Sequence, residues 1–107
     1  SIELLPEILS LSDIKATMRF RIMTYIDANN SNHREIFKNY FKANIAIRNF
    51  EEQSTWGINR DREELVFAIN DKSNVPYGFK VEDPFQIEQL GNIFVAIWGK
   101  LRQDFRL

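Results

Sequence analysis

The spacing of apolar residues predicts helices through the N-terminal half of this chain. Ser12 and Asp13 supply an N-cap signal for a helix over about 12–27. Its apolar residues fall on two sides, as expected of a central helix. After a polar, Asn-rich turn, the helical period resumes over about 33–42. The predicted apolar positions are Ile14, Met18, Ile22, Tyr25 and Ile26, with Ala16, Phe20 and Met23 on the second side of the first helix, and Ile36, Phe37, Tyr40 and Phe41 in the second helix.

The second helix is not expected to continue straight into the next segment. A continued register would place Ile45 on the polar side and Arg48 on the apolar side. We therefore predict a turn near residues 43–44, then a third short helix to about residue 53. Residues 2–9 are predicted to form a short leading helix or an extended arm. Trp56 and Gly57 open a stretch that we predict to be irregular.

The C-terminal half predicts a β-hairpin and one long helix. Segments 64–69 and 79–82 carry strand patterns on either side of a polar turn cluster. Asp83 and Pro84, with Gln86, then form a helix start with a capping box. An apolar stripe follows, predicting a helix over 84–105 that would be about 33 Å long. It is expected to be the longest helix and to bury Leu90, Phe94, Ile97 and Leu101.

Together these elements predict a single domain over residues 1–107 that is mainly α, in the sense of an α+β fold with one small β-hairpin. Four to five helices would form a compact core, and the C-terminal helix would be the long one. A winged helix is the alternative, with 44–53 as recognition helix and the hairpin around 72–77 as wing. Two observations count against a winged helix. Segment 44–53 is apolar and acidic, and the sequence pI of about 5.8 is far below the basic pI usual for DNA-binding domains.

The composition limits the cellular compartment in which the chain is expected to function. Hydrophobic residues make up 44% of its 107 residues, which is enough to form one core without disulfide bonds or a structural metal. There are no cysteines, which excludes disulfides and thiolate metal sites and fits a reducing compartment. No apolar run approaches the roughly 18 residues that span a bilayer, and the start carries no export signal. We therefore expect no membrane association and a cytoplasmic location.

Each standard catalytic arrangement lacks at least one member in this sequence, and a nuclease built from Asp61, Glu64 and a lysine has no supporting motif. His33 is the one histidine, so no two-histidine metal site can form, and the four glycines are too scattered for a phosphate-binding loop. His33 is expected to be solvated or to cap the second helix. Paired carboxylates such as Glu51 with Glu52 point apart on a regular element. We therefore predict no catalytic residue, no metal, no cofactor and no enzymatic activity.

The main functional hypothesis is a non-catalytic protein-interaction module, such as a small inhibitory or assembly domain. The apolar stripe of the final helix is longer than a core of this size can cover. We expect self-association or a protein partner there, with aromatic side chains as anchors. The candidate interface residues are Trp56, Tyr77, Trp98 and Phe105.

Nucleic-acid binding is the alternative function, and it depends on where the basic residues lie. Residues 14–50 hold seven of the 14 positive charges but two of the 15 negative ones. Three of these cations follow one another at four-residue spacing on the second predicted helix, where they could contact phosphates. The candidate contacts are Arg34, Lys38, Lys42, Arg48 and, in the predicted wing, Lys72.

Overall fold

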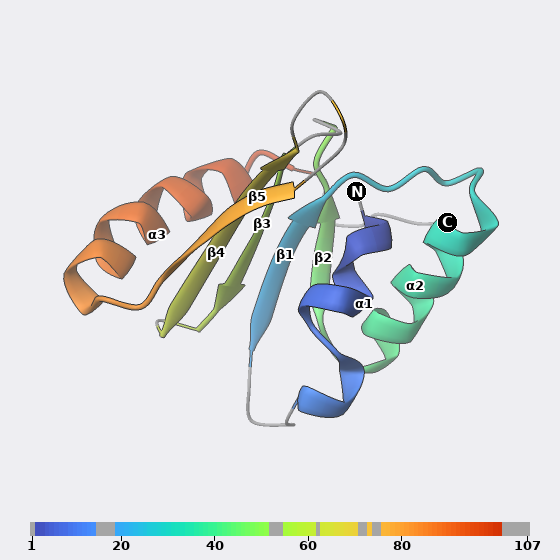
Figure 1. Cartoon of the computed structure of the whole chain (residues 1–107), viewed down its shortest axis with the longest axis horizontal. Helices are drawn as coiled ribbons and strands as arrows, with labels where there is room; N and C mark the ends of the chain where they lie inside the picture. Colours follow the sequence, from blue (N-terminus) through green and yellow to red (C-terminus); the bar gives the residue numbers. More distant parts are fainter. Residues whose placement is uncertain are drawn as a thin grey trace.

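The computed structural model describes residues 2–14, 19–51, 55–61, 63–70, 73 and 76–101. The fold is α+β, with a five-stranded mixed sheet that has helices packed on both faces (Figure 1). In chain order the elements are the 3-10 turn η1 (Ile2–Leu4), α1 (Leu5–Ile8), the 3-10 turn η2 (Leu11–Asp13), β1 (Phe20–Thr24), α2 (Ser31–Lys42), β2 (Ala46–Asn49), β3 (Thr55–Arg60), β4 (Glu64–Asn70), β5 (Pro76–Val81) and α3 (Pro84–Trp98).

The strands lie in the order β2-β1-β3-β4-β5, so β2 and β5 form the two edges. The first two strands are parallel and are joined through α2, whereas β3, β4 and β5 follow as antiparallel neighbours. Ile22 of β1 lies opposite Ile47 on one side and Ile58 on the other. This register places apolar residues of three strands side by side.

Each face of the sheet has its own core. Alternate residues of a strand point to opposite faces, so neighbouring positions such as Ile22 and Met23 belong to different cores. The α2-side core includes Ile2, Leu5, Phe20, Ile22, Phe37, Tyr40, Ile47, Trp56 and Ile58. The α3-side core consists of Met23, Leu65, Val81, Ile87, Phe94 and Trp98, with half-buried neighbours around them. Figure 1 shows α1 and α2 beside β1 and β2, and α3 along β3 and β4.

The predicted central helix over 12–27 is wrong in its described part, because β1 occupies Phe20–Thr24. The two-sided apolar pattern has a different origin from the one we expected. Phe20 and Ile22 face the α2-side core while Met23 faces the α3-side core, so the strand is buried on both faces. A short strand of this kind has the same apolar content as a buried helix and lacks clean alternation.

The prediction of a mainly α fold with four to five helices is therefore wrong. The predicted third helix is also a strand, since β2 (Ala46–Asn49) pairs in parallel with β1. Trp56 and Gly57 lie within β3 rather than in an irregular stretch. With β2 in place of a recognition helix, the winged-helix alternative is wrong as well. The predicted break before this segment is confirmed: α2 ends at Lys42, and Asn44 adopts a left-handed φ of 63°.

The start of the last helix forms as predicted, and so does the hairpin, although β5 begins at Pro76, three residues before the predicted strand. β4 and β5 are antiparallel, with Leu65 opposite Val81. The Asp83 side chain accepts a hydrogen bond from the Gln86 N–H, and Pro84 opens α3. α3 is the longest helix of the described residues but ends at Trp98, and residues 102–107 lie outside the description. Of the residues expected inside, Phe94 is fully buried, and the three half-buried ones are Leu90, Ile97 and Leu101.

Candidate nucleic-acid interface

The inward side of α2 fixes how the helix sits on the sheet. His33, Phe37 and Tyr40 recur at helical spacing on this side, and all three are buried. The Tyr40 hydroxyl donates a hydrogen bond to the Leu9 carbonyl, and burial raises the pKa of this hydroxyl. These contacts determine which residues of α2 face solvent.

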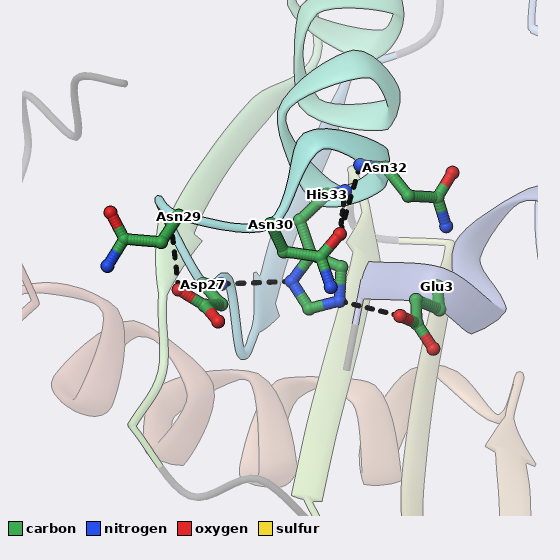
Figure 2. Close-up of polar contacts among 6 residues, drawn as sticks. All are labelled: Glu3, Asp27, Asn29, Asn30, Asn32 and His33. Carbon is green, nitrogen blue, oxygen red and sulfur yellow. Dashed lines mark hydrogen bonds and ion pairs between the residues drawn. The ribbon is translucent and has the colours of Figure 1, made fainter.

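The first turn of α2 is held by a set of polar contacts around His33 (Figure 2). The Asn30 side-chain oxygen caps the helix by accepting from the N–H groups of Asn32 and His33, at 3.0 and 3.1 Å. His33 Nδ1 accepts from the Asp27 N–H at 2.9 Å. The ring proton is therefore on Nε2, which lies 3.0 Å from Glu3 Oε1. His33 is 4% exposed, so the expected solvated or capping position is wrong: its side chain joins three segments inside the fold.

The outward side of α2 carries the α2 basic row, which consists of Arg34, Lys38 and Lys42. All three side chains are exposed, and none forms an ion pair or hydrogen bond with another described residue. Successive members are separated by about 6 Å along the helix axis, as four residues of α-helix require. Their charges are therefore open to solvent along one line.

An exposed aromatic ring lies beside the basic row. Phe41 was expected in the apolar stripe of the helix, yet it is 66% exposed. Its ring stacks on the buried Phe37 ring, with centroids 5.9 Å apart and planes 19° apart. Lys38 lies three residues before Phe41, so the two side chains are neighbours on the helix surface. The stacking on Phe37 holds the Phe41 ring in place while one face of it stays accessible.

The first two turns of α2 also form a shallow hollow of about 510 Å³. It is lined by Ser31, Arg34, Glu35 and Lys38. Glu35 is an acidic side chain between two members of the basic row, so the local charge is mixed. An anion at this position would be attracted by Arg34 and Lys38 and opposed by Glu35.

Arg48, another predicted nucleic-acid contact, is placed on the opposite face of the sheet. Ile47 faces the α2-side core, so the next residue of β2 faces α3. Its guanidinium donates to the Trp98 carbonyl at the end of α3 and lies 4.1 Å from the centre of the Trp98 ring. Burial lowers the pKa of Arg48, and nearby Arg21 lowers this pKa further. Arg48 therefore joins β2 to α3 and lies apart from the basic row.

We expect Arg48→Ala to reduce the free energy of unfolding by about 1–2 kcal/mol, through loss of the charged hydrogen bond and the ring contact. Arg48→Lys keeps the charge but lacks the planar group, and should fall between wild type and alanine. Arg19→Ala, which removes an exposed cation away from Arg48, is the matched control. The measurement is the urea midpoint at unchanged slope. Equal midpoints for Arg48→Ala and Arg19→Ala would show that the contact with Trp98 contributes nothing.

The three candidate interface residues that the structure describes do not come together. Trp56 lies buried in the α2-side core and Trp98 in the α3-side core, where its ring stacks on Phe94 at 6.0 Å. Tyr77 is exposed on β5. Phe105 and, among the candidate nucleic-acid contacts, Lys72 lie outside the described residues. The two tryptophans therefore serve the interior of the protein.

The described residues contain neither a candidate metal site nor a membrane-spanning helix. No group of three or more His, Cys, Asp or Glu side chains within them could hold a metal ion. No helix among them is long and apolar enough to cross a membrane. In the part of the chain that the structure describes, the outward face of α2 combines accessible cations with an accessible aromatic ring.

Neither a protein-family model nor a curated protein matches this chain. Among solved structures it is similar to TrmBL2, described as an archaeal chromatin protein that shows a novel mode of DNA binding. The two share 13% sequence identity with a TM-score of 0.49. The similarity covers 80% of this chain and 45% of that one, so this chain spans less than half the length of TrmBL2.

Proposed function

We propose that this chain is a non-catalytic macromolecule-binding domain that contacts nucleic-acid phosphates through the outward face of α2. The observation that carries the proposal is the α2 basic row, whose three cations are exposed without an ion-pair partner among the described residues. The row spans about 12 Å. Along one nucleic-acid strand this corresponds to about three to four phosphates.

The exposed Phe41 ring supports contact with unpaired bases. Proteins that bind single strands combine a basic surface with aromatic side chains on which bases stack, and every base offers a flat face for this contact. Phe41 is next to the basic row and already stacked on Phe37, so a base could bind its free face without reordering the ring. A duplex would use the cations and leave this ring unused.

The test measures how binding depends on salt concentration. Binding is monitored through the fluorescence anisotropy of a labelled oligonucleotide, once as a single strand and once as a duplex. Three phosphate contacts predict a slope of log affinity against log salt of about −2 for the single strand. A fourfold rise in salt should then weaken binding about 20-fold. Replacing Arg34, Lys38 and Lys42 together by alanine should remove this salt-dependent binding.

The matched control removes three exposed cations elsewhere, Arg19, Arg21 and Lys100, by alanine substitution. It should keep the affinity and slope of the wild type. The proposal is wrong if the wild type shows no binding at low salt, or if the basic-row variant keeps the wild-type slope. Phe41→Ala should weaken single-strand binding at least about fivefold and leave duplex binding unchanged, because the ring acts by base stacking.

A second candidate function, binding of a protein partner, is favoured by the outer side of α3. This helix carries one charged residue, Glu88, among its fifteen, and such apolar helices are usually buried all round. Here Phe85, Ile93 and Val95 are exposed large apolar side chains. A partner at this helix would contact these residues rather than the buried Trp98. Charge substitutions at Phe85 and Ile93 would abolish such a complex and leave nucleic-acid binding intact.

A further inference from the structure

The β5 edge, which we define as Pro76–Val81, is an open edge of the sheet. In the described part of the chain β5 pairs with β4 on one side and with no strand on the other. Open edges are usually blunted by shortness, charge or proline. The opposite edge strand, β2, is four residues long. β5 has six residues, and the proline of β5 stands at the first position. The one charged side chain within β5, Lys80, lies 3.3 Å from Glu64 and 3.8 Å from Glu82.

Exposed apolar side chains line the same edge. Tyr77 and Phe79 point to the α3 face of the sheet and are 66% and 56% exposed. Ile69 of β4 lies opposite Tyr77 and is also exposed, and Phe79 packs against Phe67 with ring centroids 5.5 Å apart. The edge therefore combines a side that pairs with no other strand of the described residues with an accessible apolar strip.

We propose that β5 pairs antiparallel with β5 of a second copy of this chain, in a register centred on Gly78. A two-fold axis perpendicular to the sheet joins two such edges and keeps each face of the sheet on its own side. In an antiparallel pair, directly opposed residues point to the same face of the sheet. The axis must therefore pass between one residue and the same residue of the second copy. Centred on Gly78, Tyr77 of each copy lies opposite Phe79 of the other. The result is one continuous ten-stranded sheet across the two copies.

The pattern of side chains favours this register over one centred on Lys80, and it favours a second copy as the occupant. A register centred on Lys80 would bring the two Lys80 side chains face to face, and like charges directly opposite are unfavourable. The Gly78 register instead forms two aromatic cross-strand pairs on the α3 face, and it sets Lys80 opposite Pro76. At its centre, two glycines leave the other face uncrowded. The edge is thus complementary to itself in both charge and apolar character.

Cysteine cross-linking tests the register directly, because the chain has no cysteine of its own. Opposed residues of antiparallel strands have Cα atoms about 4.5–5.5 Å apart, which suits a disulfide. Under mild oxidation, a mixture of Tyr77→Cys and Phe79→Cys chains should form mixed disulfide dimers. Each variant alone should stay uncross-linked, as should Phe85→Cys, an exposed position on α3. Cross-linking of Phe79→Cys with itself, or no mixed dimer, would overturn the proposed register.

The oligomeric state provides the second test. Sedimentation of the wild type should show a mass that rises towards two chains with concentration. Tyr77→Lys should keep the far-ultraviolet spectrum and remain one chain, whereas Phe85→Lys should dimerise like the wild type. A wild type that stays a single chain at all concentrations, or a dimer lost in Phe85→Lys but kept in Tyr77→Lys, would overturn the proposal. The basic-row alanine variant should still dimerise, which separates this result from nucleic-acid binding.

Discussion

Replacing Phe94 by alanine is expected to reduce the free energy of unfolding by about 3–5 kcal/mol, which is the range for large aromatic side chains in cores. Phe94 is completely buried at the centre of the α3-side core. Its ring stacks on Trp98 at 6.0 Å and meets Phe67 edge-on at 6.4 Å. Ile87 and Trp98, together with half-buried neighbours, hold α3 on the strands beneath it, so the cavity would have little chance to collapse. Chemical denaturation followed by tryptophan fluorescence gives the measurement.

Gly57 of β3 explains why this site requires a large ring. A Cβ added at Gly57 would lie 3.3 Å from the Phe94 ring and 3.4 Å from the Met23 methyl group, so the ring occupies the space that a side chain would take. Gly57→Ala should therefore cost less in a Phe94→Ala background than in the wild type, because its methyl group partly fills the cavity. Additive effects would contradict this coupling. Phe85→Ala, on the exposed side of α3, is the control and should change stability by at most about 0.5 kcal/mol.

The elements that could be predicted from the sequence are those defined by local chemistry. The start of α3 depends on Asp83, Pro84 and Gln86, and the end of α2 depends on a register break a few residues long. The hairpin of β4 and β5 joins segments that are adjacent in the chain. In each case the interacting groups lie close together in sequence. Propensity and spacing were therefore sufficient.

The strands that were missed depend on partners far away in the chain. β1 pairs with residues 46–49 and 57–60, and the sequence of β1 itself indicates none of these pairings. Its apolar residues face two cores, which removes the alternation that normally identifies a strand. β2 was missed because the helical period before it suggested another helix, although Ile45 and Ile47 are β-branched residues that favour a strand.

The same distinction applies to the candidate site. The α2 basic row could be found from sequence because four-residue spacing on a helix places side chains on one side whatever the fold. Arg48 could not be assigned, because its face depends on the register of β2 in the sheet. Phe41 belongs to the apolar period of α2 but lies beyond the area that the sheet covers, and only the structure shows this. An aromatic residue three positions after a member of the basic row, as Phe41 is after Lys38, is the signal that sequence analysis could have used.

His33→Ala is expected to reduce the free energy of unfolding by about 2–3 kcal/mol. The substitution leaves the part-buried Asp27 N–H without its acceptor and removes the contact from Nε2 to Glu3. It also removes the hydrogen bond between α2 and the segment that follows β1, so the first turn of the helix should open more often. Amide exchange at Asp27 should speed up by more than the loss of global stability explains. An Asp27 amide that stays protected would show that another group accepts its hydrogen bond.

Two variants separate the role of His33 from general effects on the turn. Asn32→Ala changes an exposed neighbour in the same turn and should alter stability by at most about 0.5 kcal/mol. Asn30→Ala removes the helix cap, which is expected to cost about 1 kcal/mol, but leaves the Asp27 contact in place. Because Arg34 follows His33 directly, an opened first turn should also displace that cation from the basic row. His33→Ala should therefore reduce the salt slope of single-strand binding by about 0.7, the contribution of one phosphate contact, while Lys38 and Lys42 keep theirs.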